Sequence, residues 1–145
     1  LVMAGRATPE VESLTKLSRA LSIEDQVFYS GYVPVRDLPQ FYGAADVFVY
    51  PSLYEGFGMP PLEAMACGIP TITSSAAALA EVVGEGAWQV EPYDEVGLTE
   101  AIIQLITDKR TATRLAQKGM EWAKRYSWKK AVMETMLVYE AVKSH

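Results

Sequence analysis

Short apolar runs alternate with amphipathic helical stripes along this 145-residue chain, and this alternation constrains the fold more than any other feature. The runs are apolar on both faces, which is typical of strands buried within a parallel sheet. The stripes between them carry apolar residues at helical spacing. The pattern predicts an α/β fold with a mostly parallel sheet and helices on each side. The predicted strands are 1–5, 27–30, 46–51, 71–73 and 87–90, and the predicted helices are 10–21, 38–45, 61–67, 79–83, 95–107, 111–126 and 128–142.

Composition excludes several classes of function. Half of the residues are hydrophobic and 21% are charged, as in a globular protein. The 13 basic and 18 acidic side chains argue against a nucleic-acid partner, which needs a basic face. Cys67 is the only cysteine, so no internal disulfide is possible and a cytoplasmic setting is expected. No apolar run reaches the roughly 18 residues of a membrane span, while peripheral membrane association through another part of the protein stays open.

Segment 51–70 is the expected place for ligand chemistry. Ligands of such sheets bind beyond the carboxyl ends of the strands, and this segment holds the longest and most glycine-rich loop there. Gly56 and Gly58 allow backbone amides to approach a ligand without an intervening Cβ. Pro60 and Pro61 suit a helix start, where free N–H groups and the positive end of the helix favour a diphosphate.

Two carboxylates lie in the same segment. Glu55 precedes the glycines, and Glu63 is expected in the first turn of the helix. Ionised carboxylates only accept hydrogen bonds, so they suit the paired hydroxyls of a ribose or a sugar. The residue types also fit an ordinary interpretation, in which Glu63 compensates the helix dipole and Glu55 is a solvated turn residue. Spacing alone therefore predicts an α/β domain suited to phosphates and no more.

Segments 54–58 and 61–70 resemble the signature of the large retaining glycosyltransferase family 4, whose members have the two-domain GT-B architecture. That signature has two glutamates separated by seven residues, and Glu55 and Glu63 fit it. Further blocks resemble family sequences at 1–5, 31–34, 44–49, 81–84 and 126–128. The resemblance implies a single Rossmann-like donor-binding domain, the C-terminal half of a GT-B protein, over 1–145, with C-terminal helices at 109–145.

The resemblance also assigns roles to individual residues. Glu55 is the expected catalytic residue, which faces the transferred sugar and holds its hydroxyls near the reacting carbon. Glu63 is expected to bind the ribose hydroxyls. The other expected contacts are the backbone of Gly56, Phe57 and Gly58 with sugar and phosphates, Met59 beside them, Leu62 near the nucleotide, and Tyr32 and Val33 along the base.

The implied reaction transfers a sugar from a UDP-, GDP- or ADP-linked donor to an acceptor hydroxyl with retention at the anomeric carbon. The family uses no metal or other cofactor, and no residues here have metal-ligand spacing. Cys67 is expected to pack in the core rather than to act as a nucleophile. Trp122, Tyr126 and Trp128 are expected to pack the C-terminal helices.

Parts of the family pattern are missing. The first domain, which binds the acceptor, and the first strand and basic loop of the donor domain precede the region that resembles 1–145, so the isolated chain is expected to be inactive. Strands 1–5 and 46–51 would then face an open slot. We expect upstream sequence or a strand from another chain to fill it, or the two strands to pair directly.

Three other interpretations stay open. The chain could be a non-catalytic domain that binds a nucleotide sugar, or part of another GT-B enzyme such as a glycogen or starch synthase or a nucleotide-sugar epimerase. A flavodoxin-like interaction module is the third. The donor base, the sugar, the acceptor and the linkage are not predicted by the sequence.

Overall fold

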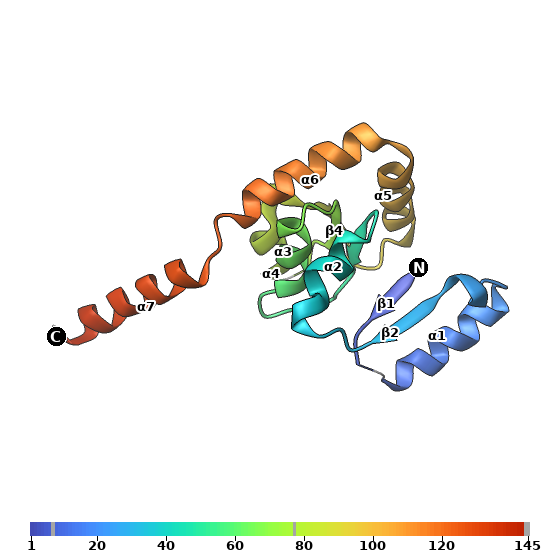
Figure 1. Ribbon diagram of the computed structural model, residues 1–145, viewed down its shortest axis with the longest axis horizontal. Helices are drawn as coiled ribbons and strands as arrows, with labels where there is room; N and C mark the ends of the chain where they lie inside the picture. Colours follow the sequence, from blue (N-terminus) through green and yellow to red (C-terminus); the bar gives the residue numbers. More distant parts are fainter. Residues whose placement is uncertain (7, 77, 144–145) are drawn as a thin grey trace. The chain divides into compact units, whose positions relative to one another are not determined.

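The computed structural model describes residues 1–6, 8–76 and 78–143, which form two compact units, Leu1–Phe41 and Tyr42–His145. Figure 1 labels the α-helices of both units and strands β1, β2 and β4. The described strands make two sheets, β1-β2 in the first unit and β3-β4-β5 in the second. All strand pairs are parallel, which confirms the predicted α/β class.

The first unit is a small parallel βαβ arrangement. Strands β1 (Val2–Ala4) and β2 (Phe28–Gly31) pair directly, and helix α1 (Pro9–Ala20) connects them together with short 3-10 turn η1 (Glu24–Gln26). Helix α1 begins with proline, which needs no N–H partner there, and has two glutamates in its first turn, near the positive end of the helix. Turn η2 (Val35–Asp37) leads into α2 (Leu38–Gly43), and the boundary between the units lies within α2.

The second unit carries the longer sheet. Its strands are β3 (Phe48–Tyr50), β4 (Thr71–Ser74) and β5 (Trp88–Val90), with β4 in the centre. The helices are α3 (Met59–Ala66), α4 (Ala78–Val83), α5 (Glu95–Thr107), α6 (Lys109–Ala123) and α7 (Trp128–Lys143), and a 3-10 turn, η3 (Gly84–Gly86), precedes β5.

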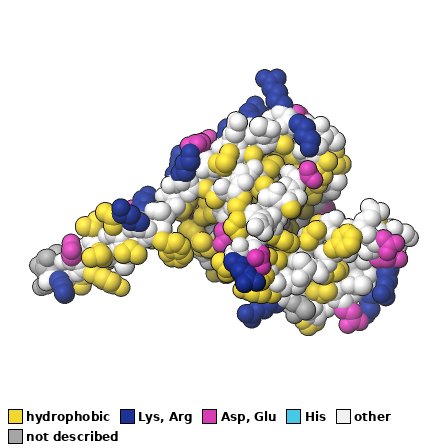
Figure 2. Space-filling view, viewed as in Figure 1, with side chains coloured by type: hydrophobic (Ala, Val, Ile, Leu, Met, Phe, Trp, Pro, Cys, Tyr) yellow, Lys and Arg dark blue, Asp and Glu magenta, His cyan; other side chains and the backbone are white. Residues whose placement is uncertain are grey.

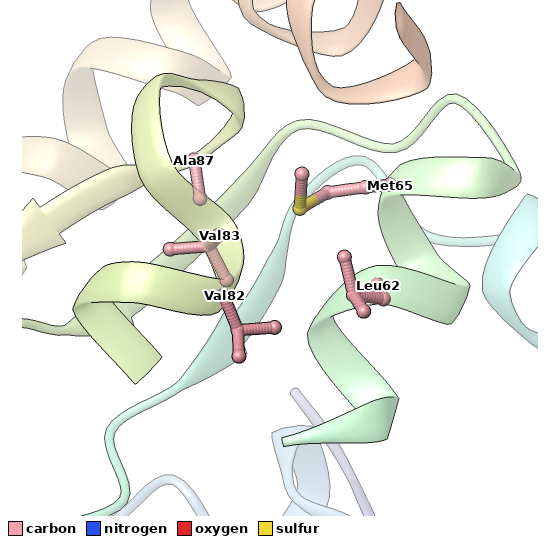
Figure 3. Packing of buried hydrophobic residues seen from close by; sticks show 5 residues of the cluster. All are labelled: Leu62, Met65, Val82, Val83 and Ala87. Carbon is pink, nitrogen blue, oxygen red and sulfur yellow. The ribbon is translucent and has the colours of Figure 1, made fainter. Parts of the chain in front are cut away.

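Two apolar clusters stabilise the second unit. One joins α3, α4 and the chain before β5 through Leu62, Met65, Val82, Val83 and Ala87 (Figure 3), and Trp122 of α6 packs against it. The other joins the sheet to α5 and α6 through Ile72, Val90, Ala101, Leu105 and Ala112. Together they fix α3, and with it the loop that precedes it, on the sheet.

The sequence pattern overestimated the burial of the outer strands. Among the described strands, only β4 is buried along its whole length. Val2 of β1 is 55% exposed and Phe28 of β2 is 60% exposed. The reason is the number of paired strands. Among the described strands, β4 lies between two others, whereas β1 and β2 pair with each other alone.

The open edges of β1 and β3 bear on the expected strand order. In the described residues, β1 pairs with β2 within the first unit and β3 pairs with β4 within the second. An edge strand carries unpaired N–H and C=O groups that invite another strand. All three expectations, upstream sequence, a strand from another chain or direct pairing of the two strands, stay predictions.

Helix α7 exposes every one of its residues to solvent. Figure 2 shows hydrophobic side chains along it. Trp128, its first residue, is 78% exposed. The prediction that Trp128 packs is therefore wrong, whereas Trp122 does pack on the core. Within the described part of the chain, no helix is both long and apolar enough to cross a membrane.

Two buried threonines of β4 allow a matched test of hydroxyl burial. Thr71 Oγ1 donates to the Ile69 carbonyl, whereas Thr73 Oγ1 has no partner among the described residues. Thr73→Val is expected to leave the free energy of unfolding unchanged or to raise it by about 1 kcal/mol, because it removes an unsatisfied hydroxyl. Thr71→Val is expected to lower it by about 1 kcal/mol. Urea unfolding measures both, and equal losses would contradict the assignment.

Candidate functional site

Glu55 lies in the loop after β3, and one of its carboxylate oxygens is held by two hydroxyls. Oε1 accepts from Tyr50 Oη at 2.6 Å and from Ser52 Oγ at 3.0 Å. No described residue donates to Oε2. The carboxylate is thus fixed through one oxygen while the other can accept from a ligand.

Glu63 has a similar arrangement on α3. Its Oε2 accepts from Tyr42 Oη at 2.9 Å. Helix α3 begins at Met59 with Gly58 as its N-cap, so Glu63 is in the second turn. The prediction of a first-turn glutamate in a helix starting at Pro61 is therefore wrong, and its partner is a tyrosine hydroxyl rather than the helix end.

An aromatic row joins the tyrosines that hold the two glutamates. The ring of Tyr42 packs edge-on against Phe48, with centroids 5.4 Å apart, and Phe48 stacks with Tyr50 at 6.1 Å. Phe48 and Tyr50 are two residues apart on β3, so their side chains lie on the same face of the strand. Glu55 is therefore held from one face of β3, and the tyrosine that holds Glu63 packs against a ring of that same face.

The environment keeps both tyrosine hydroxyls protonated. Burial, followed by the hydrogen bond to Glu55, raises the pKa of Tyr50 to about 12. Burial and the hydrogen bond to Glu63 raise the pKa of Tyr42 as well. At neutral pH both groups are neutral donors, so each glutamate has a partner without a compensating positive charge.

The glycine-rich loop ends at a strained, buried glycine. Gly58 is buried and has φ of +88°, and a Cβ there would collide with the side chain of Leu79. Pro60 and Pro61 lack N–H groups and occupy the first turn of α3, which removes two of the helix's free donors. Amide donors for a phosphate must therefore come mainly from the loop itself and from Met59.

The loop is also tied to β4. Ser74, at the end of that strand, is buried, and its hydroxyl donates to the Ser52 carbonyl. Ser52 in turn donates to Glu55. The hydroxyl of Ser74 thus anchors the loop on which Glu55 lies to the end of β4.

The remaining predicted contacts in this unit differ in exposure. Phe57 is 43% exposed and packs edge-on against Tyr126 with centroids 5.8 Å apart, and Met59 is 40% exposed. The side chain of Leu62 is buried in the core cluster of Figure 3. Its expected contact with a nucleotide stays a prediction.

Three further expectations concern residues outside this loop. Tyr32 and Val33 follow β2 in the first unit, where Tyr32 is 65% exposed and Val33 is half-buried. Their contact with a base stays a prediction. Cys67 is exposed, so its expected core packing is wrong. It follows the last turn of α3, whose buried side chains belong to the preceding residues.

Sequence reasoning missed the residues that hold the glutamates. Tyr50 and Ser52 precede Glu55 closely, and their hydroxyls could have been considered from local spacing. Tyr42 gives no such signal because it is 21 residues from Glu63. Tyr126, expected to pack the C-terminal helices, packs on Phe57 instead.

Neither a metal cluster nor the hollow along α6 marks the site among the described residues. Within the described ranges, no three His, Cys, Asp or Glu side chains gather as a metal site. A hollow of about 570 Å³ lies along α6 and contains none of the predicted site residues. We place the candidate site at the two glutamates because it rests on specific hydrogen bonds, whereas the hollow is an open surface feature.

Known proteins with similar sequences identify the family. Residues 1–122 match the family described as glycosyl transferases group 1. The O-antigen chain mannosyltransferase B of Escherichia coli is 38% identical over 140 residues, which are 97% of this chain and 37% of that protein.

Solved structures agree with this match. The sucrose-phosphate synthase of Thermosynechococcus elongatus superposes with a TM-score of 0.90 at 29% identity, covering 99% of this chain and 38% of that one. The HepE protein of Anabaena, solved in complex with UDP-glucose, has a TM-score of 0.84 at 25% identity and covers 99% and 40%. These likenesses confirm the Rossmann-like fold of a C-terminal GT-B domain. This chain spans about two fifths of these proteins, and it belongs to the group 1 glycosyltransferases.

Proposed function

We propose that residues 1–145 form the donor-binding domain of a retaining glycosyltransferase of family 4, which takes a hexose from a nucleoside diphosphate. The observation that carries the proposal is the pair of carboxylates held by tyrosines of one row of packed rings, each with one oxygen anchored and one left to accept. The UDP-glucose complex of HepE supports a nucleotide sugar as the ligand. The mannosyl transfer named for the Escherichia coli relative makes a mannosyl donor the first sugar to test.

In this proposal the two glutamates bind different parts of the donor. Glu63 accepts from the ribose hydroxyls, and Glu55 accepts from hydroxyls of the sugar near the anomeric carbon. The loop amides of Gly56, Phe57 and Gly58 face the diphosphate. Tyr32 and Val33 lie along the base, with Met59 and Leu62 beside the nucleotide.

The proposed reaction moves the sugar between two oxygens. The bond from the anomeric carbon to the diphosphate breaks, and the acceptor oxygen bonds to the same face of that carbon and loses its proton. Negative charge develops on the leaving diphosphate, so preorganised amides are expected to stabilise the transition state. No metal or cofactor is part of the proposal.

The rest of the protein supplies what these residues do not. We propose that a separate N-terminal domain binds the acceptor and that residues outside this chain contribute cations to the diphosphate. The proposed setting is the cytoplasm, in keeping with a lone unpaired cysteine among the described residues.

The division of roles predicts different losses for two variants. Glu63→Ala is expected to weaken binding of the best-bound nucleotide among UDP, GDP and ADP by about tenfold or more, because a hydrogen bond to a charged group is lost. Glu55→Ala is expected to leave that affinity nearly unchanged and to reduce the preference for the sugar nucleotide over the free nucleotide. Titration calorimetry measures both. Equal losses of nucleotide affinity in the two variants would show that the roles are wrongly divided.

A further inference from the structure

The two site carboxylates share an unusual form of support. Each glutamate has one oxygen bound by a tyrosine hydroxyl, Tyr42 for Glu63 and Tyr50 for Glu55. The two tyrosines lie on either side of Phe48 in one row of packed rings. A glutamate side chain has three free torsions, whereas a packed tyrosine ring has few accessible orientations, so the row limits where each carboxylate can lie.

We infer that Tyr42 and Tyr50 are positioning residues, which orient Glu63 toward the ribose and Glu55 toward the transferred sugar. The inference rests on the proposed function, since it concerns the same two carboxylates. Neither tyrosine needs to touch the donor. Each acts by holding one carboxylate oxygen so that the other presents its lone pairs to a pair of hydroxyls.

The chemical type of the hydrogen-bonding side chain matters as well as its presence. An arginine or lysine in place of each tyrosine would neutralise the carboxylate and draw its charge away from the ligand. A neutral phenol satisfies one oxygen and leaves the negative charge for the hydroxyls of the donor. Ser52 adds a second donor to Oε1 of Glu55, which leaves Oε2 as the oxygen that faces the ligand.

Removal of the hydroxyl alone tests the inference, because Tyr→Phe keeps the packed ring. The probes are the best-bound nucleotide among UDP, GDP and ADP, its 2′-deoxy form, and its glucose and mannose conjugates. Tyr42→Phe is expected to narrow the preference for the ribonucleotide over the deoxynucleotide by about tenfold, the typical effect of one hydrogen bond to a charged group. Tyr50→Phe is expected to leave the ratio of ribonucleotide to deoxynucleotide affinity unchanged. It is expected to lower the ratio of sugar-nucleotide affinity to free-nucleotide affinity.

These ratios distinguish positioning from mere structural support. A loss of folding would weaken all probes together and lower the melting temperature, but it would not change one ratio and spare the other. Tyr139→Phe is the matched control, because Tyr139 is 68% exposed on α7 and is expected to change neither ratio. In a double-mutant cycle, Tyr42→Phe is expected to add little to Glu63→Ala, since the tyrosine acts through that carboxylate.

Two different outcomes would contradict the proposed function and the positioning role of the tyrosines. If Glu63→Ala has no effect on any of the three nucleotides, the proposed function fails at this site. If Glu63→Ala weakens binding while Tyr42→Phe and Tyr50→Phe leave both ratios unchanged, the proposed function stands and the positioning role is wrong.

Discussion

Trp122→Ala is expected to lower the free energy of unfolding of the second unit by about 3 kcal/mol, as in other losses of a large core side chain. The indole packs against the core cluster that joins α3 and α4, and its Nε1 donates to the Val82 carbonyl at 2.8 Å. The guanidinium of Arg125 lies 3.8 Å from the ring centroid. A loss of this size is a large part of the roughly 5–15 kcal/mol that stabilises a typical domain.

The ring itself contributes through close approach to η3. A Cβ on Gly84 would collide with the indole, so the ring covers this turn directly. Trp122→Phe keeps an aromatic ring and removes the N–H donor, and it is expected to cost about 1 kcal/mol because the Val82 carbonyl loses its partner. Unfolding in guanidinium chloride, monitored by circular dichroism, measures the free energy of unfolding of both variants. A loss below 1 kcal/mol for Trp122→Ala would show that α6 is not needed for this core.

Gly58→Ala is expected to destabilise the second unit by about 2–3 kcal/mol and to weaken donor binding. Its φ of +88° lies in the left-handed region, where a residue with a Cβ costs about 1–2 kcal/mol. The added methyl would also collide with Leu79, whose side chain is fully buried and has little room to move. The loop would have to shift, and Glu55 and Met59 on either side of Gly58 would shift with it.

Gly56→Ala is the matched control for this position. A Cβ at Gly56 meets no atom within 4 Å, and its backbone is not left-handed. The variant is expected to fold with nearly unchanged stability, as measured by thermal unfolding. If Gly56→Ala destabilised the unit as much as Gly58→Ala, the cause would be general stiffening of the loop rather than the geometry at Gly58.

Local chemistry predicted most helix boundaries well. Helix α5 begins at Glu95, as predicted, because Asp94 accepts a hydrogen bond from the Gly97 amide at its N-terminus. The start of α3 was missed by two residues, since prolines mark a first turn without fixing their place in it. The close approach of Leu79 to Gly58, which leaves no room for a Cβ at the end of the loop, is a long-range contact that neighbours in sequence do not reveal.

Burial and long-range contacts were harder to predict. The apolar run 1–5 has the composition of a buried strand, but among the described strands β1 pairs with β2 alone. The glutamate spacing located the candidate loop, whereas the hydroxyl of Tyr42 reaches Glu63 only after the strands and α3 are assembled. A sequence pattern reports periodicity along the chain, and such contacts depend on which segments meet in space.

The dependence of both carboxylates on one row of rings, two of which belong to β3, has a consequence for how such sites can diverge. Inserting or deleting a single residue ahead of Phe48 in β3 would turn Phe48 and Tyr50 to the opposite face. Glu55 would lose the hydroxyl of Tyr50, and Tyr42, which holds Glu63, would lose its ring contact with Phe48. We therefore expect segment 42–63 to change as one structural unit, in which the length of β3 is under stronger constraint than the lengths of the surrounding loops. We expect new preferences for the nucleotide sugar to arise through substitutions around this segment, or by exchange of the whole segment between related proteins.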